Sequence, residues 1–197
     1  MPPEMLKTLP GYDPDVQNNR VEARQLMRKL GYGPAHRLSI KLSVRDLPFL
    51  RDPAVILIDQ LKEVYIDGEL NPIDTTQWYP MLTRKDYKVA LNITETEVDD
   101  PDPVLHENYV CGAQRNYTGY CNPEVDQLAE RQSTESDIEK RRRLVWEVER
   151  KLAEDDARLI LFYLQNANCS RPQLKGLTTM ANSIYNAWRF EDLWLDK

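Results

Sequence analysis

Acidic side chains are dense in one stretch of the sequence, where a strand-like run gives way to a polar loop. Residues 94–103 include two glutamates and three aspartates. Carboxylate oxygens at such density could hold a hard cation, with Asp99, Asp100 and Asp102 as the candidate ligands. Their spacing lacks the regular ligand positions of a known calcium loop, so a solvated acidic turn is the favoured interpretation.

Side chains for nucleophilic or metal-assisted catalysis are not arranged in a recognised pattern. No Gly-x-Ser-x-Gly sequence occurs, and no pairing of a cysteine with a histidine is indicated. The two histidines, His36 and His106, lie far apart, and neither is spaced with a cysteine as in a zinc site. No enzyme, metal centre or other cofactor is therefore predicted.

The three cysteines include one pair that could form a bond. Cys111 and Cys121 flank a loop of glycine, asparagine and tyrosine, and Cys169 is left over as a free thiol. In an oxidising compartment a Cys111–Cys121 bond would close a loop of about ten residues, which the loop-entropy model values at roughly 2.7 kcal/mol. The alternative is two unpaired thiols.

Aromatic side chains near this loop could line a pocket, although aromatic residues more often pack in a core. The candidates are Trp78, Tyr79, Tyr109, Tyr117 and Tyr120.

A strand must position the polar loop. Residues 87–93 alternate, with Tyr87, Val89, Leu91 and Ile93 on one face, so the register of this strand is fixed by its apolar side. Prolines at the end of the acidic segment then force the chain out of the sheet. A rigid strand that ends in a polar loop is a common place for a ligand site.

The other periodic segments alternate between strand and helix, which predicts an α/β domain with a mixed sheet and flanking helices. Capping residues place helix starts at Asn19, at Asp52 with Pro53, and at Ser136 with Glu139, while Gly68 is expected to close the second helix. Strands are predicted near residues 37–45, 69–74, 86–93 and 158–164, and helices near 19–31, 53–68, 78–84, 123–132 and 136–155. In the first helix, Ala23, Leu26, Met27 and Leu30 are spaced as one apolar, buried face, and residues 1–18 before it are predicted to be an extended lead-in.

Composition and charge restrict the class of protein. With 41% hydrophobic and 29% charged residues, the 197-residue chain is typical of a globular protein of one or two domains. A net charge of −6 argues against a nucleic-acid partner, which would favour a basic face. No apolar stretch is long enough to span a membrane, and Met1–Glu4 does not begin like a signal peptide.

The order of several segments resembles the C-terminal part of a family 5 extracellular solute-binding protein, the dipeptide- and oligopeptide-type binding proteins of bacterial ABC importers. The resemblance covers nearly the whole chain from about Tyr12. The segments that carry it are Ala23–Tyr32, Tyr87–Leu91, Asp100–Asp102, Asn116–Asp126, Asp137–Leu152 and Leu159–Leu164.

This resemblance implies the C-terminal lobe of a periplasmic binding protein-like (class II) fold, with no catalytic role. In the family, two lobes close on a small solute and deliver it to membrane permease subunits, and an acidic residue after the central strand pairs with the amino terminus of a peptide. Glu95 and Glu97 are the nearest acidic candidates. The expected ligand-binding residues are Ile93, Thr94, Glu95, Thr96, Glu97, Asn116 and Tyr117. Some dipeptide-type members carry a cysteine pair in the corresponding loop, which supports the Cys111–Cys121 bond.

The resemblance also implies a domain plan and a location. Residues 1–166 would form the ligand-binding lobe, incomplete at its start, and residues 167–197 a tail that returns to a first lobe encoded upstream together with a periplasmic signal peptide. Large side chains in this tail lead us to expect that it either folds back on its own lobe or packs against a second copy of the chain. A homodimer through residues 180–197 is the favoured alternative. The alternative function is a stand-alone interaction or structural domain with no small-molecule ligand.

Overall fold

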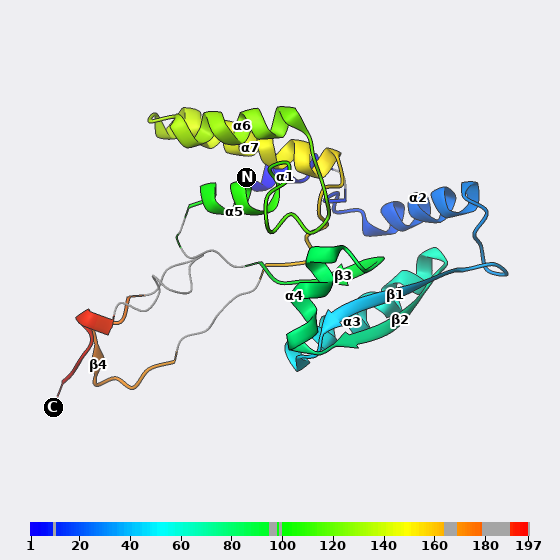
Figure 1. The fold of residues 1–197 in the computed structure, drawn as a ribbon, viewed down its shortest axis with the longest axis horizontal. Helices are drawn as coiled ribbons and strands as arrows, with labels where there is room; N and C mark the ends of the chain where they lie inside the picture. Colours follow the sequence, from blue (N-terminus) through cyan, green and yellow to red (C-terminus); the bar gives the residue numbers. More distant parts are fainter. Residues whose placement is uncertain (10, 95–97, 99, 164–168, 179–189, 197) are drawn as a thin grey trace. The chain divides into compact units, whose positions relative to one another are not determined.

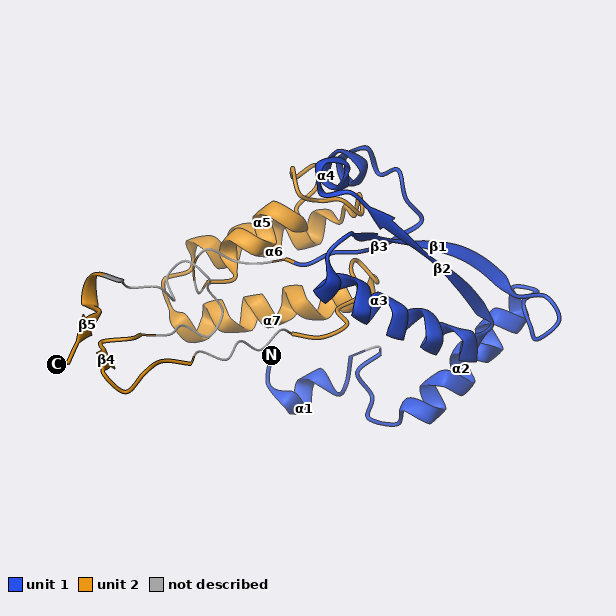
Figure 2. Cartoon of the chain, turned by 90° about the horizontal axis from the view of Figure 1, so that it is seen from below, with its two compact units in different colours: residues 1–93 blue, residues 94–197 orange. Residues whose placement is uncertain are grey.

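The computed structural model describes residues 1–9, 11–94, 98, 100–163, 169–178 and 190–196. The chain divides into two compact units, residues 1–93 and residues 94–197 (Figures 1 and 2). The division falls just after the strand that was predicted at residues 86–93, where that strand was expected to give way to the polar loop.

A three-stranded parallel sheet organises the first unit. Its strand order is β2-β1-β3, so that β1 is central and pairs with a neighbour on each side. The strands are β1 (Leu38–Arg45), β2 (Ile66–Ile73) and β3 (Val89–Leu91). The predicted α/β class with flanking helices is confirmed, and the three described strands of this sheet are all parallel.

Helices α3 (Pro48–Leu61) and α4 (Thr75–Arg84) lie on opposite sides of this sheet (Figure 2). Right-handed crossovers from β1 out to β2, and from β2 back past β1 to β3, require this arrangement. Leu42 and Val44 of β1 are fully buried and pack with Leu50 and Ala54 of α3. Alternate residues of β1 therefore face α3, and the residues between them face the side of α4.

Several predicted boundaries of this unit were wrong by about one turn. Helix α3 begins at Pro48 rather than after Asp52, and Pro53 lies inside it. The helix ends before the short 3₁₀ turn η1 (Lys62–Val64), and the chain turns at Tyr65, whose φ is 66°. Gly68 does not close the helix: it lies in β2, where an added Cβ would be 2.8 Å from Ile58 Cγ1.

Helix α2 (Val16–Lys29) contacts the unit through arginines rather than through the predicted apolar face. Arg20 pairs with Glu63 at 2.8 Å, and Arg28 donates to the Tyr65 hydroxyl at 2.7 Å. Leu26 and Leu30, expected to be buried, are 59% and 72% exposed. The predicted lead-in also contains a short helix, α1 (Pro3–Leu6).

Three helices form the core of the second unit. They are α5 (Asp102–Asn108), α6 (Pro123–Thr134) and α7 (Ile138–Glu154). Helices α6 and α7 lie side by side in both views (Figures 1 and 2). Leu105, Tyr109, Val125 and Val148 are buried among them. Asp137, not Ser136, caps α7 by accepting hydrogen bonds from the first turn of the helix.

The strand predicted at residues 158–164 is not present in its described part, residues 158–163. Leu159 and Tyr163 are 76% and 78% exposed, and the three residues between them are also exposed. A continuous apolar run predicts burial on both faces. The sequence of this apolar run does not indicate which segment would pack on it. Among the described residues, no segment buries residues 159–163.

The tail pairs with itself in its described residues. Strands β4 (Leu174–Lys175) and β5 (Trp194–Leu195) are antiparallel, and the 3₁₀ turn η2 (Phe190–Asp192) precedes β5. The predicted domain boundary after residue 166 lies outside the described residues and stays a prediction.

Candidate functional site

The carboxyl ends of the three parallel strands form the edge of the sheet where a ligand site is expected. The chain runs from β1 to β2 on one side and then crosses to β3 on the other. The strand order therefore reverses between β1 and β3. In open α/β sheets, ligands bind outside the carboxyl ends of the strands at such a switch point.

Each strand end carries a polar side chain held by the helix next to it. After β1, Asp46 pairs with Arg51 of α3 at 3.2 Å. After β2, Asp74 caps α4 and accepts hydrogen bonds from the Thr76 hydroxyl at 2.6 Å and the Thr76 amide at 2.8 Å. These bonds hold the pKa of the Asp74 carboxyl below its usual value, the hydroxyl contributing most.

After β3, Asn92 Oδ1 accepts a hydrogen bond of 3.2 Å from the indole Nε1 of Trp78, a fully buried residue of α4. The neighbouring Tyr79 is 46% exposed, and its ring lies 6.0 Å from the guanidinium carbon of Arg45, the last residue of β1. Helix α4 thus holds the ends of both strands that border the switch point.

The predicted ligand-binding segment begins at this edge. Ile93 is half-buried and packs against the core between the sheet and α3, so its backbone rather than its side chain is suited to a ligand. Thr94 is exposed, and its hydroxyl accepts a hydrogen bond of 3.0 Å from Arg158 Nη1. Glu95, Thr96 and Glu97 lie outside the described residues, so their predicted role is untested.

Arg158 belongs to a polar cluster of the second unit that the sequence did not indicate. Its guanidinium also donates to Asn108 Oδ1 at 3.3 and 3.4 Å and lies 5.0 Å from the centroid of the Tyr109 ring. Asn108 is 4% exposed, so its amide fixes the guanidinium from inside the unit.

The predicted disulfide is present. Cys111 and Cys121 are bonded across a sequence separation of 10, and Cys169 is an exposed free thiol. Both predictions are thereby confirmed. The Cys111 amide also donates to Asp126 of helix α6 at 3.0 Å, which attaches the loop to the helical core.

The other two predicted contacts, Asn116 and Tyr117, lie inside the disulfide loop. Asn116 is 4% exposed, and its amide nitrogen donates to the carbonyls of Val110 and Tyr120 at 3.1 and 2.6 Å. Its Oδ1 accepts from the Gly119 amide at 3.0 Å. The side chain of Asn116 is therefore used to hold the loop together, while Tyr117 is half-buried; ligand contact by either residue stays a prediction.

The loop is joined to the end of α7 by a second set of bonds. Asp155 Oδ2 accepts hydrogen bonds from the Tyr120 hydroxyl and from Asn122 Nδ2, each at 2.7 Å. Partial burial and the carboxylate of Asp155 raise the pKa of Tyr120. The same two donors, the tyrosine first, lower the pKa of Asp155.

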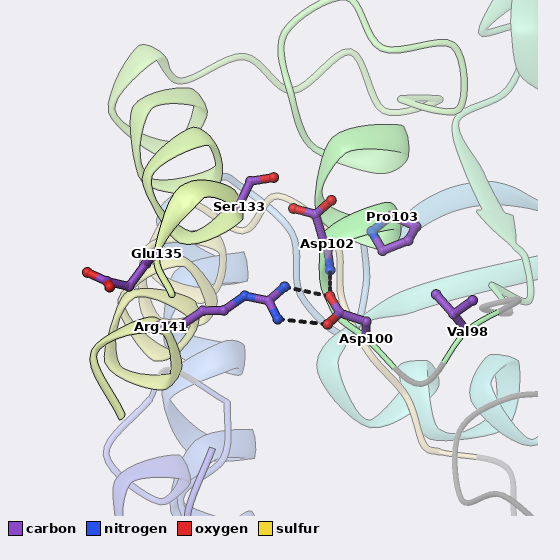
Figure 3. A pocket seen from close by; sticks show the side chains of 7 residues that line it. All are labelled: Val98, Asp100, Asp102, Pro103, Ser133, Glu135 and Arg141. Atoms are coloured by element: carbon purple, nitrogen blue, oxygen red, sulfur yellow. Dashed lines mark hydrogen bonds and ion pairs between the residues drawn. The ribbon is translucent and has the colours of Figure 1, made fainter. Parts of the chain in front are cut away.

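The acidic turn is part of an ion pair in its described residues (Figure 3). Asp100 accepts hydrogen bonds from two guanidinium nitrogens of Arg141, at 2.8 and 2.6 Å, and this contact lowers the pKa of Asp100. Asp102 accepts a hydrogen bond from the amide of Gln132. An open depression of about 340 Å³ lies beside these groups, lined also by Val98 and Ser133.

These contacts indicate a structural role for the described part of the turn, in which Arg141 neutralises the charge of Asp100. Asp99, the third carboxylate considered for a cation, lies outside the described residues. Within the described part of the chain, no group of three or more His, Cys, Asp or Glu side chains is placed to hold a metal ion. The described helices also include none that is both long and apolar enough to cross a membrane.

The aromatic candidates separate into two groups. Trp78 and Tyr109 are buried and pack as core residues, whereas Tyr79 is exposed at the switch point. Sequence reasoning missed Arg45 there, because an arginine at the end of a predicted strand has no distinguishing local signal. The pattern of residues 87–93 did place Asn92 opposite the apolar face, which was the one available indication.

Comparison with known proteins gave matches in structure. No family model matches the chain, and no curated protein matches it in sequence. OppA of Haemophilus influenzae, solved in complex with RPPGFSPFR, matches 99% of this chain with a TM-score of 0.80 and 18% identity. OppA of Burkholderia pseudomallei matches 95% of the chain with a TM-score of 0.77 and 18% identity.

A third match is CtaP of Listeria monocytogenes, an ABC transporter substrate binding protein. It matches 76% of this chain with a TM-score of 0.62 and 25% identity. The chain spans 38%, 37% and 30% of the lengths of these three proteins, respectively. The resemblance to solute-binding proteins of ABC importers is thus confirmed at the level of the fold, which corresponds to a part of such a protein.

Proposed function

We propose that the chain is part of the substrate-binding component of an ABC importer and binds a small solute, such as a peptide, for delivery to a membrane permease. The observation that carries this proposal is the switch point between β1 and β3, where exposed polar and aromatic side chains border a sheet edge. The fold match to OppA, at a TM-score of 0.80, supports the same class of function. The role is one of binding, without a catalytic step.

The proposed location is the periplasm. A disulfide between Cys111 and Cys121 fits an oxidising compartment, since cytosolic proteins rarely keep such bonds. Export would require a signal peptide in a longer protein. That protein would also contain a first lobe that faces this one. The proposed partners are therefore that lobe, the permease subunits and the solute.

Within the proposed site, the segment from Ile93 to Glu97 would contact the solute directly. Ile93 would contribute its backbone and Thr94 its hydroxyl, while Glu95 or Glu97 would pair with a ligand ammonium group. Asn116 and Tyr117 would contribute to ligand binding from within the disulfide loop. Thr94 follows shortly after β3 in the sequence, which supports this assignment.

A lobe that binds without its partner lacks half of the contacts of a two-lobed site, so the isolated chain should bind weakly. Thermal unfolding of the 197-residue chain with peptides, sugars, opines or metal chelates tests the proposal. A ligand at about ten times its Kd stabilises the folded chain by roughly 1.4 kcal/mol.

Peptides should raise the unfolding temperature at millimolar concentration, and the other solutes should not. If only another class of solute raised the unfolding temperature, that class would replace peptides as the proposed solute. If no class of solute raised the unfolding temperature, binding by this chain would be contradicted and a stand-alone interaction domain would be favoured.

The tail is proposed to meet another protein surface, either the first lobe or a second copy of the chain. Trp194 and Leu195 of β5 are 57% and 66% exposed in the described tail. A homodimer through residues 180–197 would cover them. Light scattering should then give twice the mass of one chain, and deletion of residues 180–197 should return the mass to that of a monomer. If the 197-residue chain were a monomer, the dimer would be contradicted.

A further inference from the structure

Arg158 follows α7, and its guanidinium is held by two nearly buried residues. Both of its Nη nitrogens donate to Asn108 Oδ1, at 3.3 and 3.4 Å, and the group lies 5.0 Å from the centroid of the Tyr109 ring. Asn108 and Tyr109 are only 4% and 9% exposed. Hydrogen bonds to a buried acceptor, together with contact to an aromatic ring, restrict the orientation of the guanidinium.

The acceptor on Asn108 is itself fixed. The amide nitrogen Nδ2 of Asn108 donates to the Val104 carbonyl at 3.1 Å, one turn earlier in α5. An asparagine amide has its donors on nitrogen and its acceptor on oxygen, so this bond leaves Oδ1 to face Arg158. The position of the Arg158 guanidinium is therefore set from inside the second unit.

Thr94 is bound by the same guanidinium, since Arg158 Nη1 also donates to the Thr94 hydroxyl oxygen at 3.0 Å. An arginine side chain has no acceptor, so the hydroxyl must accept in this contact and keeps its own hydrogen for another partner. Thr94 is exposed, and no residue in the described part of the chain accepts that hydrogen. A hydroxyl that accepts from a cation is polarised, which makes its hydrogen a better donor.

We propose that Arg158 is a positioning residue, which fixes the Thr94 hydroxyl as a hydrogen-bond donor to an oxygen atom of the solute. This oxygen belongs to a peptide carbonyl or a terminal carboxylate, because both groups accept hydrogen bonds and neither donates them. The adjacent positive charge disfavours an ammonium group of the solute at this position. The inference rests on the proposed function for the contact between Thr94 and the solute, whereas the effect of Arg158 on Thr94 can be tested in the free chain.

The first experiment needs no solute. In the full chain labelled with carbon-13 and nitrogen-15, three-bond couplings of the Thr94 methyl carbon report which staggered conformer its side chain adopts. Wild type should show a single conformer, and Arg158→Met should show averaged couplings because the hydrogen bond of 3.0 Å is lost. Arg115→Met is the matched control and should leave the couplings unchanged, since Arg115 belongs to the same unit but pairs with Glu107 at 3.2 Å. Averaged couplings in wild type, or wild-type couplings in Arg158→Met, would overturn the positioning role.

The second experiment measures the binding of trialanine by NMR titration. Thr94→Val, which replaces the hydroxyl with a methyl group, should weaken binding about fivefold, and Thr94→Ser should bind as wild type does. Arg158→Met should also weaken binding, whereas Arg158→Lys should retain a part of the effect. In the Thr94→Val background, Arg158→Met should cause no further loss, because Arg158 acts through Thr94. Losses that add in the double variant would contradict this coupling.

The two experiments distinguish the failures of the two proposals. Trialanine binding that was unchanged in Thr94→Val would overturn the donor role of Thr94 but leave peptide binding in place. A single Thr94 conformer that depended on Arg158, without binding of trialanine, would support the positioning role and contradict peptides as the solute. The Thr94 variants leave the buried part of the cluster intact, so they test the donor role even if Arg158→Met reduces stability. Trialaninamide separates the two kinds of oxygen: the effect of Thr94→Val should persist with it for a peptide carbonyl and disappear for a terminal carboxylate.

Discussion

Asp155 shows how two neutral donors can make one carboxylate important for stability. The Tyr120 hydroxyl and the Asn122 amide each donate to it at 2.7 Å. Both bonds favour the ionised form, and the pKa of Asp155 is therefore lowered from its ordinary value of 3.8. A carboxylate with a lowered pKa contributes stability above its unfolded pKa, and this contribution is lost as the pH falls through the folded value.

The first prediction concerns this residue. The unfolding free energy of the wild-type chain should fall between neutral pH and pH values below 3.8, the ordinary pKa of an aspartate such as Asp155. In Asp155→Asn this fall should be smaller. Urea unfolding followed by circular dichroism at both pH values measures the difference. Asp59→Asn, which removes an exposed carboxylate from α3, controls for the loss of one negative charge. If Asp155→Asn and wild type lost the same stability on acidification, the lowered pKa would be contradicted.

Tyr120 should respond at the other end of the pH scale. Its pKa is raised, first by partial burial and then by the hydrogen bond to Asp155. Its contribution to stability is therefore present below the unfolded pKa of about 10 and declines as the pH rises through the folded value.

Single residues of the site were predictable from sequence to different degrees. The disulfide partners were found because their spacing and the loop composition are local features. Arg45 could not be found, because its position over the Tyr79 ring depends on how α4 packs on the sheet, which no local pattern indicates. The internal use of the Asn116 amide likewise depends on the closed shape of the loop.

At the scale of elements, the disulfide loop gives the second prediction. Replacing Cys111 and Cys121 with serine opens a loop with a sequence separation of 10. The loop-entropy model predicts a loss of roughly 2.7 kcal/mol in unfolding free energy. Urea unfolding of the oxidised protein measures this loss. Cys169→Ser is the control and should change little, since Cys169 is an exposed free thiol. Equal stability of the double variant and wild type would refute the expected stabilisation.

The pairing of β4 with β5 depends on one glycine. Gly176 has a φ of 77°, and a Cβ added to it would lie 1.9 Å from the Asp192 carbonyl oxygen. Neither the backbone conformation nor the space is available to alanine.

The third prediction is that Gly176→Ala separates the two strands of the tail. The amide of Asp196, which donates to the Gln173 carbonyl at 2.9 Å, should then exchange with solvent faster. Hydrogen exchange followed by NMR measures the rate. Gly112→Ala is a matched control, because Gly112 also has a positive φ of 74° but has no atom within 4 Å of an added Cβ. Unchanged protection of the Asp196 amide in Gly176→Ala would contradict the pairing.

Element types were predicted more reliably than element ends. Alternation identified the three strands of the sheet, and helical periodicity identified α3, α6 and α7. The starts of helices differed because several polar residues compete as caps: Asp15 caps α2 and Asp137 caps α7, each near the residue expected from sequence. The short pair β4–β5 has too few residues for a periodic pattern, and the apolar run at residues 159–163 indicated burial without indicating a partner.

At the scale of the whole molecule, the chain corresponds to a little over a third of the OppA proteins that it matches, at 37% and 38% of their lengths. A site at the carboxyl edge of one sheet would then form one side of a larger binding site. The exposed apolar residues 159–163 and the exposed Trp194 fit a chain that meets further protein surface. Affinity measured on this chain should accordingly be a lower limit for any protein in which a second lobe completed the site.

The most direct test of the central claim is to map where a peptide binds. A tripeptide titrated into the nitrogen-15-labelled chain should shift the backbone amides of residues 44–46 and 91–94, at the carboxyl ends of β1 and β3, with a Kd of about 1 mM or weaker, equivalent to roughly −4 kcal/mol. Shifts confined to the depression beside Asp100 and Arg141, or no saturable shift at the ends of β1 and β3, would contradict a solute site at this edge of the sheet.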